Sequence, residues 1–324
     1  MASKRAAVEE RLHAVVELGK RAPATLAMDL RPFLRDKAGI VAAAAATIAA
    51  DCELHALEKE LEETFARFLV DPVKTDPGCR AKLAAADALR KLEVRAPDVY
   101  LRGVGVRQLE PTFGPPIDTA TPVRVCCAAA LLETRHPLAL LEVAPLLADP
   151  EPNARAGVAA VLGTVGGEAC EALLRLKVRA GDPEPQVVGA CLQGLLSASF
   201  DRGFPFVLDA IKEADDGADR AALLAMGESR DERALSALRE YSERAQDKEG
   251  RKSALLALSI SRMPAAHEYL LHLVEEAPER RALEALAALE SQRFDAVLIE
   301  RLRAVAMAHG GSVSDAFVAM TNRR

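Results

Sequence analysis

The sequence predicts an all-α fold, a right-handed α-solenoid (superhelix) of about eight stacked helical hairpins. Hydrophobic residues make up 50 % of the chain and aromatic residues only 4 %, while Ala and Leu, both good helix formers, dominate. The tetrapeptide DPEP occurs at residues 149–152 and again at 182–185. The apolar and small positions that follow the two copies coincide, which is typical of a repeating unit.

The repeat extends beyond these two copies. A marker position, usually Arg, precedes an apolar position by seven residues at Arg124, Arg155, Val188, Arg251 and Arg281, and Arg220 fits the same phase. Steps of 30 to 33 residues separate these positions, which is the range of helical repeats. Two earlier copies, at Lys37 and Arg80, are 43 residues apart and are expected to carry insertions.

Each repeat is predicted to be a pair of helices. The first begins after an Asp-Pro or Gly-Asp turn, where Asp caps free amides and Pro needs no hydrogen-bond donor. A glycine turn such as GTVGG at 163–167 then leads into a second helix such as EACEALLRLKV. One hairpin cannot bury both faces, so hairpins must stack. We expect an N-terminal capping helix at 1–30, the repeat array at 31–310 with an insertion at 93–122, and a C-terminal cap at 311–324.

The segment DPEPNARAGVAAVLGTVGGEACEALLRLK resembles the short HEAT-like repeats that also occur in phycobilin lyases. DPGCRAKLAAADALRKLE is similar to a first helix of that pattern and DERALSALREY to a second helix, and the resemblance covers most of residues 30–305. It implies a charge ladder between neighbouring repeats, interrupted by Val188. The ladder would pair Asp76 with Arg80, Asp149 with Arg155, Asp216 with Arg220, and Asp247 with Arg251.

Composition argues against several functions. The net charge is −6 without a large single-sign block, which speaks against a general affinity for phosphate backbones. The apolar stretch Ile40 to Ala50 is about half the length that spans a bilayer, and the N-terminus lacks the apolar centre of a signal peptide. We therefore expect no membrane contact and a cytoplasmic location. The cysteines are expected to be free buried thiols: Cys52, Cys79, Cys126, Cys127, Cys170 and Cys191.

No catalytic, cofactor-binding or metal-ligating residue is predicted, and the chain is expected not to be an enzyme. In HEYLLH, His267 and His272 are five residues apart, about 140° around a helix, so they cannot easily share a metal. The glycine strings GTVGGE and RGVGVRQ match neither a phosphate loop nor a dinucleotide fingerprint. No Ser or Cys stands near a His in a nucleophile motif.

The insertion departs most from the repeat. It combines Gly and Pro turns with basic, aromatic and acidic residues, a composition suited to recognition because Arg and Tyr are favoured at binding hot spots. Its candidate contact residues are Arg95, Tyr100, Arg102, Arg107, Phe113 and Asp118. A structural role is the alternative: Phe113 and Ile117 could equally plug an irregular stack.

The sequence therefore predicts a scaffold that binds a protein partner through its concave face and the 95–118 insertion. On the concave face, the candidate contacts are expected on second helices: Arg175, Lys212, Arg239, Glu243, His267 and Glu268. One alternative is a nucleic-acid groove like that of HEAT-like alkylpurine glycosylases, which the acidic charge and the absence of Trp disfavour. A phycobilin-lyase-like enzyme is another. No cofactor is expected.

Overall fold

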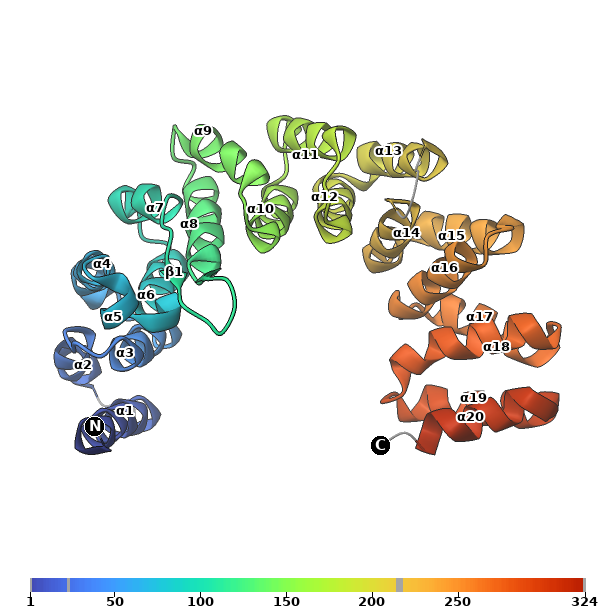
Figure 1. Cartoon of the computed structure of the whole chain (residues 1–324), viewed down its shortest axis with the longest axis horizontal. Coiled ribbons are helices and arrows are strands. Elements are labelled where there is room, and N and C mark those ends of the chain that lie inside the picture. Colours follow the sequence, from blue (N-terminus) through green and yellow to red (C-terminus); the bar gives the residue numbers. More distant parts are fainter. Residues whose placement is uncertain (1, 22–23, 214–217, 323–324) are drawn as a thin grey trace. The chain divides into compact units, whose positions relative to one another are not determined.

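The computed structural model describes residues 2–21, 24–213 and 218–322. The chain divides into two compact units, residues 1–161 and 162–324, each of which is a stack of helices. The fold is an all-α solenoid, as predicted (Figure 1).

In the first unit, short 3₁₀ segments occur at His55–Leu57, Pro77–Cys79 and Ala144–Ala148. Its α-helices are α1 (Ala2–Arg21), α2 (Leu26–Leu34), α3 (Gly39–Asp51), α4 (Glu58–Arg67), α5 (Pro72–Thr75), α6 (Arg80–Lys91), α7 (Pro97–Gly103), α8 (Thr121–Glu133) and α9 (Ala139–Val143), and α10 (Pro152–Val165) runs across the division. Two short strands, β1 (Leu109–Glu110) and β2 (Ile117–Asp118), lie between α7 and α8.

In the second unit, a 3₁₀ segment follows α18 at Glu290–Gln292. Its helices are α11 (Glu168–Ala180), α12 (Pro185–Ala198), α13 (Phe200–Glu213), α14 (Ala218–Ser229), α15 (Glu232–Arg244), α16 (Lys248–Ile260), α17 (Pro264–Glu276), α18 (Glu279–Leu289), α19 (Ala296–His309) and α20 (Gly311–Asn322). The segment predicted as a C-terminal cap thus contains α20, and the segment 1–30 contains α1 and the start of α2.

From Arg124 onward, the predicted repeat phase holds to within one residue: Arg220 and Arg281 are the third residues of α14 and α18, and the other marker positions are fourth residues. Arg124, Arg155 and Arg251 are each the fourth residue of a helix that begins a pair, and Val188 has the same position in α12. Within the described residues, the α-helices from α6 to α19 alternate along the chain. The even-numbered helices are the first helices of the pairs, and the odd-numbered helices are the second helices. The helix starts agree with this regularity, since α10 and α12 begin with Pro and Asp247 caps α16.

First helices pack directly against one another. In the second unit α12 contacts α14, α14 contacts α16, and α16 contacts α18. Small residues make this approach possible: a Cβ atom on Gly163 would lie 2.3 Å from the Cα of Gly194, and one on Gly227 would lie 2.3 Å from the carbonyl oxygen of Ala257. The core between the two rows is mainly Leu, Ala and Val, from Val188 to Met320.

Polar side chains also join residues that are one repeat apart. These cross-links connect Glu171 with Arg202, Asp201 with Arg233, Arg251 with Glu284, and Glu268 with Arg301. The partners are separated by 31, 32, 33 and 33 residues respectively. The sequence period is therefore also the period of the contacts between neighbouring repeats.

The partners predicted for the charge ladder are partly wrong. Asp76 pairs with Lys82 at 2.9 Å, with both side chains buried, whereas Arg80 is exposed. The Asp76 carboxylate also accepts the backbone N–H groups of Ala81 and Lys82, so it caps α6. The side chain that reaches this cap is Lys82, the third residue of α6, and not the first.

Two further predicted pairs, Asp247 with Arg251 and Asp149 with Arg155, also make contacts other than the expected ones. Asp247 accepts the backbone N–H of Gly250 at 2.6 Å, and Arg251 pairs with Glu284 of the next first helix at 2.7 Å. Arg155 donates to the backbone oxygen of Asp149 at 2.7 Å. The fourth predicted rung involves Asp216, which lies outside the described residues. Asp76 and Asp247 thus cap the backbone of the helix that follows, and Arg251 reaches to the neighbouring first helix.

Candidate protein-binding surfaces

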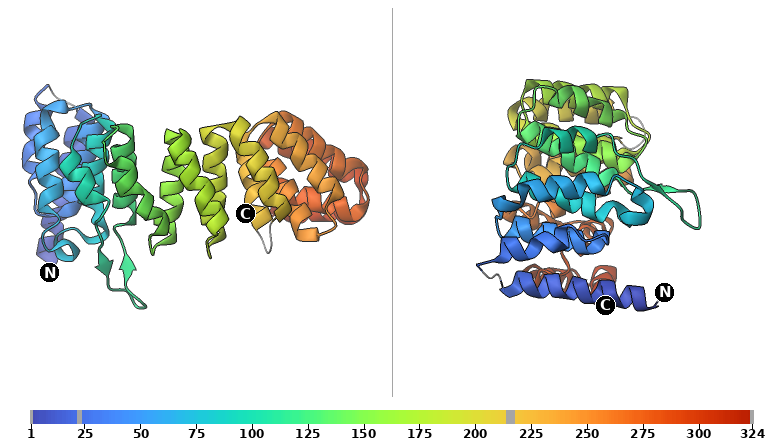
Figure 2. Two further views of the ribbon diagram at one scale, coloured as in Figure 1. Left: turned by 90° about the horizontal axis from the view of Figure 1, so that it is seen from above. Right: turned by 90° about the vertical axis from the view of Figure 1, so that its left-hand side faces the viewer.

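The clearest departure from the repeat is the segment 105–120, which we call the arm. Its strands pair antiparallel, Leu109 with Asp118 and Glu110 with Ile117. Figure 2 shows the arm projecting beyond the ends of the neighbouring helices in both of its views. The predicted insertion at 93–122 is therefore wider than the irregular segment, because α7 within it is a regular second helix that packs on α8.

The base of the arm is held by a network of two arginines and two aspartates. Arg124 of α8 is fully buried, and its guanidinium lies 2.7 Å from the carboxylate of Asp118 and 3.0 Å from that of Asp149. Arg107, at the start of the arm, lies 2.8 Å from Asp149 and 3.5 Å from Asp118. Charges of opposite sign therefore alternate, which is the condition under which buried charges are tolerated.

Both carboxyl groups are held in the ionised form. Burial would raise the pKa of Asp118, but hydrogen bonds from the N–H groups of Gln108 and Ala120 and from Arg124 outweigh it, so the pKa lies below its ordinary value. Asp149 behaves alike: burial opposes ionisation, while the hydrogen bond from Arg107 and the charge of Arg124 lower the pKa. The network is accordingly charged and paired at neutral pH.

A second anchor fastens the arm to the start of α6. The Glu110 carboxylate accepts hydrogen bonds from the Gly78 N–H at 2.6 Å, from Gln108 at 2.7 Å and from the Thr119 hydroxyl at 2.8 Å. Burial would raise the pKa of Glu110, but these three bonds together lower it. Gln108 also donates to the backbone oxygen of Asp76 at 2.9 Å. The arm is thus attached on both sides of its base.

The tip of the arm carries apolar side chains into solvent. Phe113 is fully exposed, and Leu109 and Ile117 are 62 % and 54 % exposed. The tip is ordered by its own contacts, since the Thr112 hydroxyl donates to the backbone oxygen of Pro115 at 2.8 Å. The alternative, in which Phe113 and Ile117 plug the stack, is therefore wrong; the residues that close the seam are the polar ones at the base.

Two of the predicted contact residues of the insertion are buried, contrary to expectation. Tyr100 is 1 % exposed, and its hydroxyl donates to the backbone oxygen of Val94 at 2.9 Å. Burial raises the pKa of Tyr100. The carboxylate of Asp118 is 3 % exposed in its pair with Arg124. The physical reason is that α7 packs on α8 and its Tyr100 is buried. Asp118, at the end of β2, is buried in the base of the arm by its pair with Arg124.

The remaining residues of this set do not form one patch. Arg107 belongs to the base of the arm, and Phe113 to its tip. Arg95 lies in the turn between α6 and α7, and Arg102 lies near the end of α7; both are exposed. Helix α7 separates these two positions, so the insertion presents its charges in different places.

The candidates on second helices mostly link neighbouring repeats. Arg175 of α11 donates to the backbone oxygen of Arg202 at 2.8 Å and lies 5.0 Å from the ring centroid of Phe206. Glu268 of α17 pairs with Arg301 of α19 through two hydrogen bonds of 2.7 Å. These charges therefore have structural partners.

Arg239 and Glu243, the two candidates on α15, also contact residues of α17 in the next repeat. Arg239 donates to the backbone oxygen of Ala265 and lies 5.0 Å from the ring centroid of Tyr269, whose hydroxyl donates to Glu243 at 3.3 Å. Lys212 pairs with Asp209 of its own helix at 3.2 Å. His267 is half-buried, and its Nε2 has no hydrogen-bond partner among the described residues.

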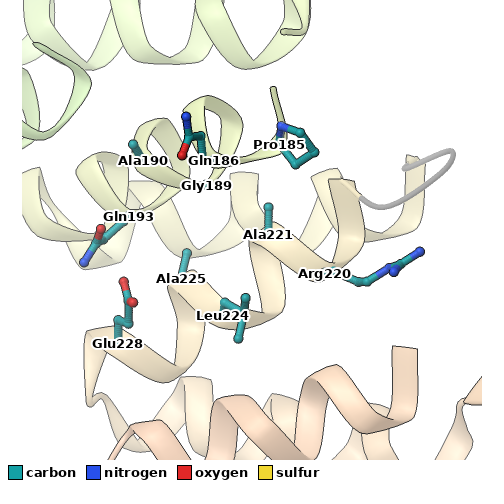
Figure 3. Close-up of a pocket in the computed structure, with 10 residues that line it drawn as sticks. All are labelled: Pro185, Gln186, Gly189, Ala190, Gln193, Arg220, Ala221, Leu224, Ala225 and Glu228. Atoms are coloured by element: carbon teal, nitrogen blue, oxygen red, sulfur yellow. The ribbon is translucent and has the colours of Figure 1, made fainter. Parts of the chain in front are cut away.

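A groove that the sequence did not reveal lies on the row of first helices. It has a volume of about 490 Å³ and runs between α12 and α14 (Figure 3). Gly189, Ala190, Ala221 and Ala225 line it with small side chains. In Figure 3, Gln193 and Glu228 face one another at one end, and Arg220 points away from the groove at the other. The small residues were visible in the sequence, but the space they leave depends on both helices.

Metal sites, membrane-spanning helices and reactive thiols each place their own requirements on the described residues. In the part of the chain that the structure describes, no three His, Cys, Asp or Glu side chains are placed to hold a metal ion. None of the described helices combines the length and apolarity needed to cross a bilayer. Cys79, Cys127, Cys170 and Cys191 are buried, whereas Cys52 and Cys126 are partly exposed, which corrects the expectation for those two. Burial raises the pKa of Cys126 to about 12, so that thiol is protonated at neutral pH.

Comparisons with known proteins address the repeats. The family model for HEAT repeats matches residues 174–259, from α11 to α16. No curated protein matches the sequence. Among solved structures, the chain is similar to the complex of CpcE and CpcF of phycocyanin lyase from Nostoc sp. PCC7120. The identity is 18 % and the TM-score 0.38, over 81 % of this chain and 93 % of that chain.

The family match includes the cross-link between Asp201 and Arg233, which are 32 residues apart, and one partner of each of the neighbouring cross-links, Arg202 and Arg251. The resemblance noted in the sequence and the contacts in the structure therefore agree. Residues 174–259 are HEAT repeats.

Proposed function

We propose that this chain is a non-enzymatic HEAT-repeat scaffold of the cytoplasm that binds a protein partner through the arm. One observation carries the proposal: Phe113 is fully exposed at the tip of a hairpin whose base is fixed by buried charges. An aromatic side chain contributes to stability only when it is buried. An exposed aromatic on a rigid support is what a partner's pocket can bury.

The support matters as much as the side chain. A preorganised contact loses less conformational entropy on binding than a floppy one. The arm is preorganised at its base by Arg124 with Asp118, and at Glu110 by three hydrogen bonds. A protein pocket, and not a phosphate backbone, fits an apolar tip of Phe and Pro that carries no basic residue.

The test begins with a photo-reactive phenylalanine analogue in place of Phe113 in the full chain. The matched control carries the analogue at Phe294, which is also exposed, at 87 %, but lies beside Arg293 in the second unit. Cross-linking at 113 and not at 294 identifies the candidate partner. The purified candidate is then titrated with the unlabelled protein and two variants.

We expect Phe113→Asp to weaken the complex by about thirtyfold, which corresponds to about 2 kcal/mol and is typical of a hot-spot residue. Phe294→Asp should leave the affinity unchanged. Equal affinities of both variants and the unaltered protein would refute the arm as the binding element. If a DNA duplex, and no protein, cross-links at 113, the nucleic-acid alternative replaces the proposal.

A further inference from the structure

A second site candidate lies at the other end of α8. A cavity of about 650 Å³ opens between the carboxyl-terminal ends of α6 and α8, a size within the usual range of small-molecule sites. The arm joins α8 at its amino-terminal end, and 13 residues of helix span about 20 Å. The cavity is therefore separate from the arm, and nothing about it depends on the proposed function.

The cavity has an excess of positive charge in an acidic protein. Four basic and two acidic side chains line it: Arg90, Lys91, Arg95, Arg135, Glu93 and Glu133. The chain as a whole carries a net charge of −6. A concentration of positive charge against that background attracts anions.

Two of the four basic side chains, Arg90 and Lys91, already form ion pairs with acidic residues. Arg90 lies 3.0 Å from Asp87 and 3.1 Å from Glu133, and Lys91 lies 3.1 Å from Asp87. The pair of Arg90 with Glu133 connects α6 to α8, and the two pairs with Asp87 lie within α6. Arg90 and Lys91 also stand in the last turn of α6, where basic residues offset the helix dipole. A structural role accounts for both.

The other two basic groups, Arg95 and Arg135, form no such ion pairs in the part of the chain that the structure describes. Arg95 and Arg135 are exposed, and within the described parts of the chain neither guanidinium group has a hydrogen-bond or ion-pair partner. Arg95 lies four residues beyond the end of α6, outside the last turn in which the dipole acts. Two guanidinium groups without partners thus line one cavity, from the turns that follow neighbouring first helices.

We propose that this cavity binds a small molecule through a phosphate-type oxyanion, with Arg95 and Arg135 as its ligands. The planar guanidinium offers parallel N–H donors that match the oxygen atoms of a phosphate. Glu93, which also has no ion pair among the described residues, lines the same cavity. It accepts a hydrogen bond from a hydroxyl or amino group, so the ligand class is a small phosphate ester that carries such a donor.

The proposal is tested by calorimetric titration of the full chain with inorganic pyrophosphate at physiological ionic strength. We expect saturable binding to one site. The double variant Arg95→Ala/Arg135→Ala should bind at least tenfold more weakly. The control Arg80→Ala/Arg102→Ala has the same net charge and removes two exposed arginines outside the cavity, so its affinity should stay within twofold of the unaltered protein.

A third variant tests the position of the anion. Glu93→Gln removes a negative charge from the cavity wall and should strengthen pyrophosphate binding severalfold. All of these side chains are exposed, so folding is retained and circular dichroism verifies it. Absence of saturable binding, equal losses in both double variants, or an unchanged affinity of Glu93→Gln would overturn the proposal. A short DNA duplex that displaces pyrophosphate, and that the cavity variant no longer binds, would assign the site to nucleic acid instead.

Discussion

Arg124 and Asp118 form an ion pair of 2.7 Å in which neither side chain is more than 3 % exposed. Asp118 ends the second strand of the arm, and Arg124 lies in the first turn of α8. Because Asp149 lies 3.0 Å from the same guanidinium, one buried arginine joins the arm, the helix that follows it and the turn that precedes α10.

The first prediction concerns this arginine. Arg124→Met leaves Asp118 and Asp149 with Arg107 as their remaining charged partner. Breaking a buried pair in this way costs about 3–5 kcal/mol. Hydrogen exchange of the α8 amides measures the loss locally, which avoids treating a chain of two units as a two-state system. In the control Arg90→Met, an exposed pair with Glu133 is removed, and the cost should be at most about 1 kcal/mol. Equal costs would contradict the buried network.

The second prediction concerns acid. The pKa values of Asp118 and Asp149 are lower in the folded protein than their ordinary value. The unfolded chain therefore takes up these protons at a higher pH than the folded one. The stabilisation is complete above the ordinary Asp pKa of about 3.9 and is lost as the pH falls through the lower folded values.

We thus expect the melting temperature of the first unit to fall as the pH is lowered from 5 to 3, because protonation of Asp118 and Asp149 removes their stabilisation of the folded state. Asp118→Asn lacks one of the two carboxyls and should show a shallower fall, although it is less stable at neutral pH. If the variant and the unaltered protein have parallel profiles, the network does not govern acid stability.

The third prediction contrasts two aromatic residues of the predicted insertion. Phe113→Ala removes an exposed ring and should change the free energy of unfolding by less than about 0.5 kcal/mol. Tyr100→Ala removes a buried ring and should cost about 3–5 kcal/mol, while Tyr100→Phe loses only the hydrogen bond to Val94, about 1 kcal/mol. Hydrogen exchange of the α7 and α8 amides gives all three values locally, again without treating a chain of two units as a two-state system. A large cost at Phe113 would mean that the tip is packed in solution.

The fourth prediction concerns the contact between first helices. Gly227→Ala places a Cβ atom 2.3 Å from the carbonyl oxygen of Ala257, so α14 and α16 must move apart at a cost of about 1–3 kcal/mol. At Gly189, the new Cβ atom would lie 3.6 Å from that of Ala221, an ordinary contact. Gly189→Ala should therefore preserve or raise the melting temperature, because Ala favours helix by about 1 kcal/mol. The reverse order of melting temperatures would show that the helices are not this close.

Much of the fold could be predicted from the sequence because its determinants are local. A helix start after Asp-Pro, and an apolar position seven residues beyond Arg124 or Arg155, are fixed within one repeat. The partners of the charges could not be predicted in the same way. Whether Asp76 meets Arg80 or Lys82 depends on the rotation of α6, and Arg251 meets Glu284 only because the next repeat brings it there.

The candidate site was predicted as a segment and not as a surface. The Gly and Pro residues between 103 and 116 show that the repeat is interrupted, but strands of two residues have no alternating pattern to reveal them. Tyr100 looked like a contact residue because its type is common at interfaces. Its burial depends on how the seven-residue helix α7 packs on α8. A helix of seven residues is too short for the spacing of its apolar residues to show which face is buried.

The carboxylate of Asp149 serves two guanidinium groups of different origin, Arg107 from the arm and Arg124 from the helical stack. A partner that draws Arg107 outward leaves Asp149 with Arg124 alone, just before α10 begins at Pro152. Asp149 also accepts the backbone N–H of Glu151 at 2.8 Å. One carboxylate therefore connects the arm, α8 and the turn before α10, so a displacement of Arg107 would change the contacts of that turn.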